Sequence, residues 1–236
     1  MLGVLFDTSL YMTQAVLKLS EVANWKVRTI LRTKRYYNRD ESMNLYKSHV
    51  LEFIEYRTAA IYHCAENLLQ QIDLVQKRVC KAMEISTEDA LNDCKLAPLT
   101  ARRDIAMLGL IHRAIIGVGP EHFRQYFRRI PNPARPSGRE NIRRHNKQLQ
   151  SHRNGKFLQL LSNSVLGLVD IYNLLPQYVV DATTVKLFQH RLQELMKVTI
   201  SKGVGKWDEL FSPRRELHCH ELRKWQDWVG TGIPPT

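Results

Sequence analysis

Lysine and arginine are concentrated in one stretch near the start of the chain. Six cations lie between residues 18 and 35, with Glu21 as the only acid among them. They are Lys18, Lys26, Arg28, Arg32, Lys34 and Arg35, and all but Lys18 are our candidate nucleic-acid-binding residues. Such a group can bind phosphates without reading base sequence, and the neighbouring Trp25, Tyr36 and Tyr37 can stack on sugars or bases. The alternative is a solvated helix face whose aromatic residues belong to the core.

A second group of cations lies in a stretch rich in proline and glycine. Residues 128–156 contain nine Lys and Arg against one acid, Glu140. Because proline and glycine disfavour regular elements, we predict a basic, poorly ordered connector here. Such an arm can bind nucleic acid, act as a nuclear-import signal or be a solvated linker, and these alternatives stay open. We add Arg143 and Arg144 to the candidate nucleic-acid-binding residues.

An arginine pair and a His-Cys-His run each suggest a possible site. Arg102 and Arg103 open a predicted helix, where the helix dipole disfavours cations. They either meet an external anion or form ion pairs within the fold, and we favour the ion pairs. His218-Cys219-His220 suggests zinc, but three adjacent residues in one extended run cannot all face a tetrahedral ion, and no second Cys or His pair is near. The sequence therefore predicts no metal site.

The composition is that of a basic globular protein. The 236 residues include 35 Lys and Arg against 23 Asp and Glu, a formal net charge of +12, and 44% are hydrophobic. A polyanion is the natural partner of such a chain, because phosphate neutralisation releases counterions. The four cysteines form no Cys-x-x-Cys pair, which is typical of reduced thiols in an intracellular protein, nuclear or cytoplasmic. No signal peptide or run of ~18 apolar residues is present, so we expect no membrane partner.

Apolar residues recur with helical spacing over most of the chain, which predicts a mainly α fold. Expected helices run from about Leu10 to Tyr36, Asp40 to Ile54, Thr58 to Glu84, Thr100 to Ile115 and Thr184 to Leu195. Asp40 is the expected N-cap of the second of these helices, and Thr183-Thr184 of the last. One short strand is expected over residues 2–6. The predicted segments are a residual strand, a helical bundle, the basic connector, a smaller helical unit and a Trp-rich tail for which disorder is one option. Their bounds are 1–7, 8–127, 128–156, 157–200 and 201–236.

Six short blocks, in order along the chain, fit one known pattern. They are Leu2-Gly3-Val4 with Asp7 and Leu10; Leu45-Tyr46-Lys47-Ser48-His49-Val50; Ile54-Glu55-Tyr56; Ile72-Asp73-Leu74-Val75-Gln76-Lys77-Arg78; Leu96-Ala97-Pro98-Leu99 with Arg102-Arg103; and Tyr172-Asn173-Leu174-Leu175-Pro176 with Val179-Val180 and with Val185, Phe188 and Leu192. Each block alone is weak, because helical periodicity is common. Together they resemble the thumb and C-terminal region of non-LTR (LINE-type) retrotransposon reverse transcriptases, with Tyr172 where that family usually has Trp.

The resemblance implies a thumb-like helical bundle that grips the RNA/DNA template–primer duplex. In that family the catalytic Asp-Asp box lies upstream of the first block, and this sequence contains no Asp-Asp dipeptide. We therefore expect no catalytic residue, no polymerisation by this chain alone and no cofactor in it, although the complete polymerase would need Mg²⁺. A separate palm segment is a further expected partner, and no small-molecule substrate is expected. Met1 stands where the family has Tyr, which suggests a reading frame that begins inside a longer element.

A second interpretation belongs to another functional class. The fold can serve as a domesticated helical module that binds a protein partner through an apolar face, without a role in nucleic-acid binding. The two interpretations differ in salt dependence, because phosphate contacts weaken steeply with salt and apolar docking does not.

Overall fold

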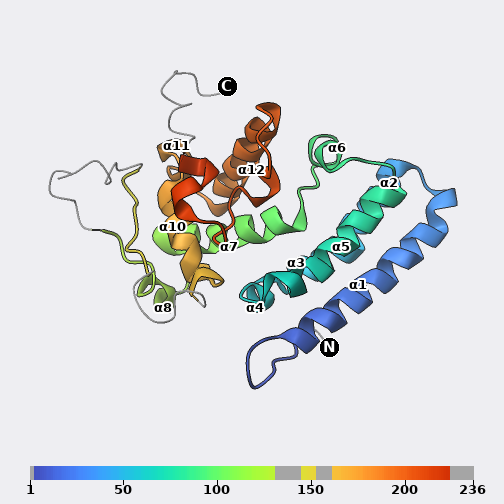
Figure 1. The fold of residues 1–236 in the computed structure, drawn as a ribbon, viewed down its shortest axis with the longest axis horizontal. Coiled ribbons are helices and arrows are strands. Elements are labelled where there is room, and N and C mark those ends of the chain that lie inside the picture. The colour runs from blue at the N-terminus through green and yellow to red at the C-terminus, as the bar shows by residue number, and fades with distance from the viewer. Residues whose placement is uncertain (1–2, 131–144, 153–160, 224–236) are drawn as a thin grey trace. The chain divides into compact units, whose positions relative to one another are not determined.

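The computed structural model describes residues 3–130, 145–152 and 161–223 (Figure 1). These residues are mostly helical and form no strand, which confirms the predicted mainly α fold. The chain divides into two compact units, Met1–Arg103 and Asp104–Thr236, and the division falls inside α7 (Leu99–Ile115). The predicted change of segment at residue 128 therefore lies within the second unit.

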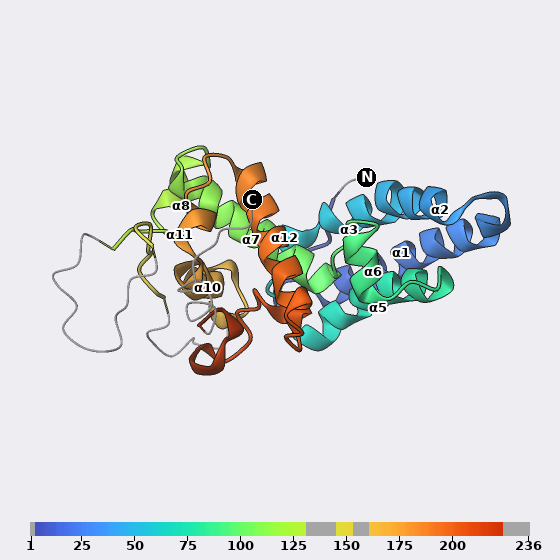
Figure 2. The same cartoon turned by 90° about the horizontal axis from the view of Figure 1, so that it is seen from above.

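The first unit contains two long helices and a third, composite one. Its elements are α1 (Thr13–Thr33), η1 (Lys34–Tyr36), α2 (Arg39–Tyr46), the π-helix η2 (Lys47–Leu51), α3 (Glu52–Glu55), α4 (Thr58–Ile61), α5 (Glu66–Ala82) and α6 (Thr87–Asn92). The segments α2, η2 and α3 follow one another without a break and return along α1, while α1 and α5 lie side by side (Figure 1 and Figure 2).

Apolar residues spaced three and four apart explain why α1 and α5 pack together. On α1 the buried positions are Val16, Leu19, Ala23, Val27 and Ile30, and on α5 they include Leu69, Ile72, Val75 and Val79. Each set forms one stripe of a helix, and the two stripes meet in the core of this unit. Two side-chain hydrogen bonds join the helices beside the core. The Ser20 hydroxyl donates to the Gln71 carbonyl at 3.1 Å, and Arg78 donates to the Asn24 side chain at 2.6 Å.

The turn between α1 and α2 is fixed by a capping box. The Asn38 side chain accepts a hydrogen bond from the Glu41 amide at 2.8 Å, and the Glu41 carboxylate accepts one from the Asn38 amide at 2.9 Å. These reciprocal bonds satisfy two amides that a helix start leaves free. The helix therefore begins at Arg39, with Asn38 as its cap instead of the predicted Asp40.

The strand predicted for residues 2–6 is wrong for the part that the structure describes. Residues 3–6 form neither helix nor strand, because no segment among the described residues pairs with them in a hydrogen-bonded ladder. Large apolar side chains of this N-terminal segment stay in contact with solvent. They are Leu5, Phe6, Leu10 and Tyr11.

Two ion pairs attach the first turn of α7 to the rest of the first unit. Arg103 forms a bidentate pair with Asp73 of α5 at 2.6 and 2.9 Å, and only 5% and 13% of the two side chains are exposed. Arg102 pairs with Glu55 of α3. The predicted ion pairs within the fold are confirmed. They also explain how two cations are tolerated in the first turn of a helix, since each meets a carboxylate.

Removing one member of the buried pair tests its importance. We expect Asp73→Ala to destabilise the first unit by about 3–5 kcal/mol, because it leaves the Arg103 guanidinium buried without its carboxylate. The double variant Asp73→Leu/Arg103→Met should lose much less stability, since it removes both charges of the pair together. Urea titrations in which hydrogen exchange of peptides from α5 is measured would give the stability of the first unit separately from that of the second. Equal losses in the two variants would contradict the ion-pair explanation.

The second unit is built around the remainder of α7. Its further elements are α8 (Glu121–Arg124), η3 (Val165–Gly167), α10 (Leu168–Leu174), α11 (Gln177–Val180), α12 (Val185–Ser201), η4 (Trp207–Glu209) and η5 (Leu217–Cys219). The Thr184 side chain caps α12 by accepting a hydrogen bond from the Leu187 amide at 3.1 Å, as the sequence predicts.

His112 lies at the centre of this unit with no exposed surface. Its Nε2 is 3.0 Å from the Ala182 carbonyl oxygen, and its Nδ1 is 3.0 Å from the Tyr172 hydroxyl. Because a carbonyl only accepts, Nε2 carries the proton and Nδ1 accepts from Tyr172. The Phe188 ring stacks on the imidazole with centroids 4.1 Å apart. Tyr172 therefore supplies a buried hydrogen-bond donor to this imidazole.

Part of the predicted basic connector belongs to the second unit. The side-chain amide of Asn173 forms two hydrogen bonds with the backbone of Leu149, each 2.8 Å long. Its oxygen accepts from the Leu149 N–H, and its nitrogen donates to the Leu149 carbonyl. Lys147 donates to the Val180 carbonyl at 2.7 Å, and Leu149 is fully buried. An isolated antiparallel bridge joins Leu149 to Arg129. Residues 145–152 are therefore packed into the fold, because one apolar side chain and several backbone groups find partners there.

The burial of His112 predicts a pH-dependent stability. Burial lowers the pKa of His112 from its ordinary value of 6.5 to about 4. Well above pH 6.5 the group is neutral in both states and contributes no pH dependence. Between pH 6.5 and about 4 the unfolded chain binds a proton that the folded chain does not, so stability falls as the pH falls, by up to about 3 kcal/mol.

The measurement compares His112→Gln with the unchanged protein. Urea titrations are run at pH 7 and pH 4.5, and hydrogen exchange of peptides from α12 reports the unfolding of the second unit. The loss of stability between pH 7 and pH 4.5 should be smaller in the variant. An identical pH dependence of the two proteins would show that another group is responsible.

No helix in the described parts of the chain combines the length and apolar content needed to cross a bilayer.

Candidate nucleic-acid interface

The solvent-facing side of α1 carries cations and an aromatic residue. Lys18, Trp25, Arg28 and Arg32 are exposed and lie opposite the buried stripe of the helix. Their separations of seven, three and four residues place them on one face. Trp25 is 65% exposed, so it is not a core residue. From Lys18 to Arg32 this face extends about 21 Å at 1.5 Å per residue. We call these four residues the α1 face.

The α1 face is strongly cationic. Within α1, Glu21 is the only acid against Lys18, Lys26, Arg28 and Arg32, and it is exposed on this same side of the helix, between Lys18 and Trp25. In the described parts of the chain, no carboxylate lies within ion-pair distance of Lys18, Arg28 or Arg32. An exposed cation without an internal partner is available to an external anion. The face therefore suits a polyanion whose charges are repeated along its length.

The remaining described candidates differ in their surroundings. The Lys26 amine lies 5.2 Å from the centre of the Phe53 ring, at the border of the α1 face. Arg35 stacks on Tyr36, which is 68% exposed, with 4.7 Å between the guanidinium carbon and the ring centre. Lys34 donates from its amine to the Ala82 carbonyl at the end of α5. This bond satisfies a helix-terminal carbonyl, which gives Lys34 a structural role.

One cation near this face escaped the sequence analysis. Arg57 stacks on the same Phe53 ring as Lys26, with its guanidinium carbon 4.2 Å from the ring centre. It also donates to the Phe53 carbonyl at 2.9 Å. The ring thus brings together two cations that lie far apart in the sequence. The Arg57 contact is local, because Arg57 follows Phe53 by four residues, a spacing that brings two side chains together on one helix face. The Lys26 contact depends on how α1 and the composite helix pack, and the sequence does not indicate it.

Arg143 and Arg144 lie outside the described residues. Arg102 and Arg103, the other arginine pair considered, are occupied by Glu55 and Asp73 as described above. The described candidates are therefore concentrated on α1 and on the η1 turn that follows it.

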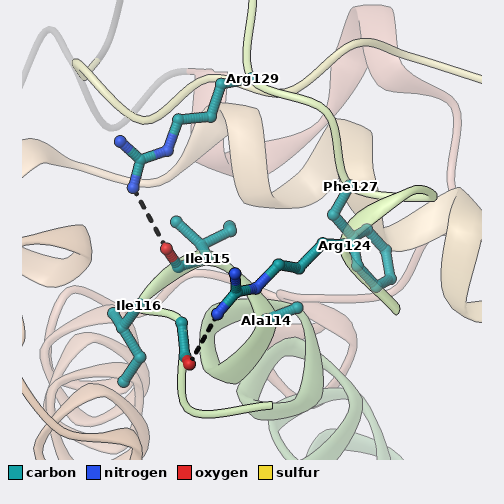
Figure 3. A pocket seen from close by; sticks show the side chains of 7 residues that line it. Ala114, Ile115, Ile116, Arg124, Phe127 and Arg129 are labelled. Carbon is teal, nitrogen blue, oxygen red and sulfur yellow. Dashed lines mark hydrogen bonds between the residues drawn. The ribbon is translucent and has the colours of Figure 1, made fainter. Parts of the chain in front are cut away.

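A pocket of about 310 Å³ lies in the second unit at the carboxyl end of α7 (Figure 3). Arg124 donates to the Gly117 carbonyl at 2.9 Å, and Arg129 donates to the Ile115 carbonyl at 3.2 Å. Arg129 thus satisfies a carbonyl that the end of α7 leaves free, and Arg124 satisfies one in the turn that follows the helix. The lining residues are Ala114, Ile115, Ile116, Gly117, Arg124, Phe127 and Arg129. Among these lining residues there is no carboxylate, thiol or imidazole, so the pocket offers no general base or nucleophile.

Comparison of the chain with family models, curated proteins and solved structures finds no match.

The exposure of Trp25 predicts that its removal leaves the fold intact. We expect Trp25→Ala to change the free energy of unfolding by no more than about 0.5 kcal/mol, because an exposed side chain loses little on truncation. Leu19→Ala, on the buried side of the same helix, should cost about 2–5 kcal/mol. Urea titrations of both variants check this. A large loss for Trp25→Ala would show that the residue is part of the core after all.

Proposed function

We propose that this chain is a nucleic-acid-gripping segment of a non-LTR retrotransposon RNA-directed DNA polymerase, and that it does not polymerise by itself. The α1 face holds phosphates of a template–primer duplex, and Trp25 stacks on an adjacent sugar or base. Lys26 and Arg35 extend the contact at its borders. These contacts position a duplex without selecting its sequence.

The observation that carries the proposal is the exposed, internally unpartnered set of cations around Trp25. Solvated cations on a helix are common, but here an exposed indole lies among them and offers a face on which a base can stack. The net charge of +12 supports a polyanionic ligand independently. The ordered blocks of sequence support the polymerase assignment, and the absence of an Asp-Asp dipeptide supports the lack of catalysis.

Removal of two α1 cations tests the proposal. The full chain is titrated into a labelled RNA–DNA hybrid at several salt concentrations, and anisotropy reports binding. We expect Arg28→Gln/Arg32→Gln to weaken binding to every duplex sequence and to lower the slope of log affinity against log salt by about 2, one unit per lost phosphate contact.

The matched control removes two exposed cations from the second unit. Lys186→Gln/Lys206→Gln changes the net charge by the same amount as Arg28→Gln/Arg32→Gln. It should leave the slope of log affinity against log salt mostly unchanged. If both double variants lose the same slope, the contact is spread over the whole basic surface and the α1 face has no special role.

A second candidate function is that of a protein-binding module. The exposed apolar side chains of the N-terminal segment favour it, because a group of this kind often marks a docking surface. Under this alternative, the titration above would give no salt-dependent binding to the hybrid. The same experiment therefore distinguishes the two functions.

A further inference from the structure

A thiol, an imidazole and a carboxylate converge at the η5 turn. The ligand atoms of Glu216, His218 and Cys219 all lie within 4.8 Å of one another. His218 Nε2 is 3.3 Å from a carboxylate oxygen of Glu216. All three residues are exposed. These groups belong to three ligand types that bind divalent zinc in proteins.

The turn itself brings Glu216 and Cys219 together. In a 3₁₀-helix residues three apart lie above one another, and Glu216 and Cys219 have this spacing across η5. The Cys219 thiol accordingly lies 3.6 Å from the Glu216 carbonyl oxygen, to which it donates. The expectation of an extended run at His218-Cys219-His220 is therefore wrong. The group that completes the cluster is Glu216, which lies outside the His-Cys-His run.

His220 does not belong to the cluster. Only 4% of this residue is exposed, and its Nδ1 accepts a hydrogen bond from the Leu222 amide at 3.3 Å. Its ring is therefore anchored away from the surface where the other three groups meet. The donor set is one sulfur, one nitrogen and one oxygen rather than the His-Cys-His triplet that the sequence suggests.

We propose that Glu216, His218 and Cys219 form a binding site for a divalent cation of the zinc class. A thiolate and a carboxylate together carry two negative charges, which balance a dication, and the neutral imidazole supplies the third ligand. Three protein ligands leave a fourth tetrahedral position for water. The thiolate selects against Mg²⁺ and Ca²⁺, which prefer oxygen ligands. This site is independent of the α1 face and of the proposed polymerase origin.

The distribution of cysteines makes a direct test possible. Cys64, Cys80 and Cys94 are buried, so Cys219 is the one exposed thiol of the chain. The reduced full-length protein is titrated with Co²⁺, a zinc substitute whose thiolate complexes absorb strongly. We expect a charge-transfer band that saturates at one Co²⁺ per chain and disappears on addition of Zn²⁺.

Variants identify the ligands. Cys219→Ser should abolish the band, and His218→Gln and Glu216→Gln should each weaken Co²⁺ binding at least tenfold. His49→Gln, which removes an exposed imidazole from the first unit, is the control and should leave binding unchanged. A missing band in the unchanged protein, or a band that survives in both His218→Gln and Glu216→Gln, would overturn the proposal.

A second measurement needs no substitution. Zn²⁺ should slow the alkylation of Cys219 at least tenfold, and a chelator should restore the original rate. Unchanged alkylation in saturating Zn²⁺ would also overturn the site.

Discussion

The attachment of α7 to α5 is the constraint on which the arrangement of the first unit depends. Arg103 and Asp73 form a buried bidentate pair, and nearby the Gln76 amide donates to the buried Ala97 carbonyl at 3.0 Å. Because a buried charge without a partner is costly, these contacts hold α5 in one position against the start of α7. The apolar stripe of α5 is thereby fixed, and α1 packs on it. The opposite side of α1, with its cations and Trp25, is consequently left to solvent.

The blocks that carry the family resemblance and the residues that carry the proposed function are mostly different. Glu55, Asp73, Arg102 and Arg103 come from three of the blocks and pair with one another. Tyr172 and Asn173, in the last block, hold His112 and Leu149 in the second unit. These residues explain how the fold is maintained. The cations of α1 lie outside the blocks. The proposed binding of a duplex is therefore argued from exposure and charge, and it can be tested independently of the family resemblance.

The sequence predicted best those features that depend on local spacing. The helical period placed α1, and Thr184 was identified as a cap because such a cap needs only a side chain and a nearby amide. Features that depend on distant partners were missed. Leu149 stands alone among polar residues, so nothing local indicates that it is buried. In the sequence, nothing distinguishes Lys34 from the neighbouring cations, because its structural role depends on the Ala82 carbonyl at the distant end of α5. The π-helix η2 keeps the apolar period of the flanking helices, which hides it in a sequence pattern.

Oxidative footprinting of the full chain with and without an RNA–DNA hybrid tests the central claim most directly, because it locates the bound surface side chain by side chain. The account predicts that Trp25 and Tyr36, both well exposed in the free protein, become protected when the hybrid binds. It also predicts that this protection is lost as salt is raised. If the hybrid binds while Trp25 and Tyr36 remain fully reactive, or if no binding occurs at low salt, the α1 face is not a nucleic-acid interface.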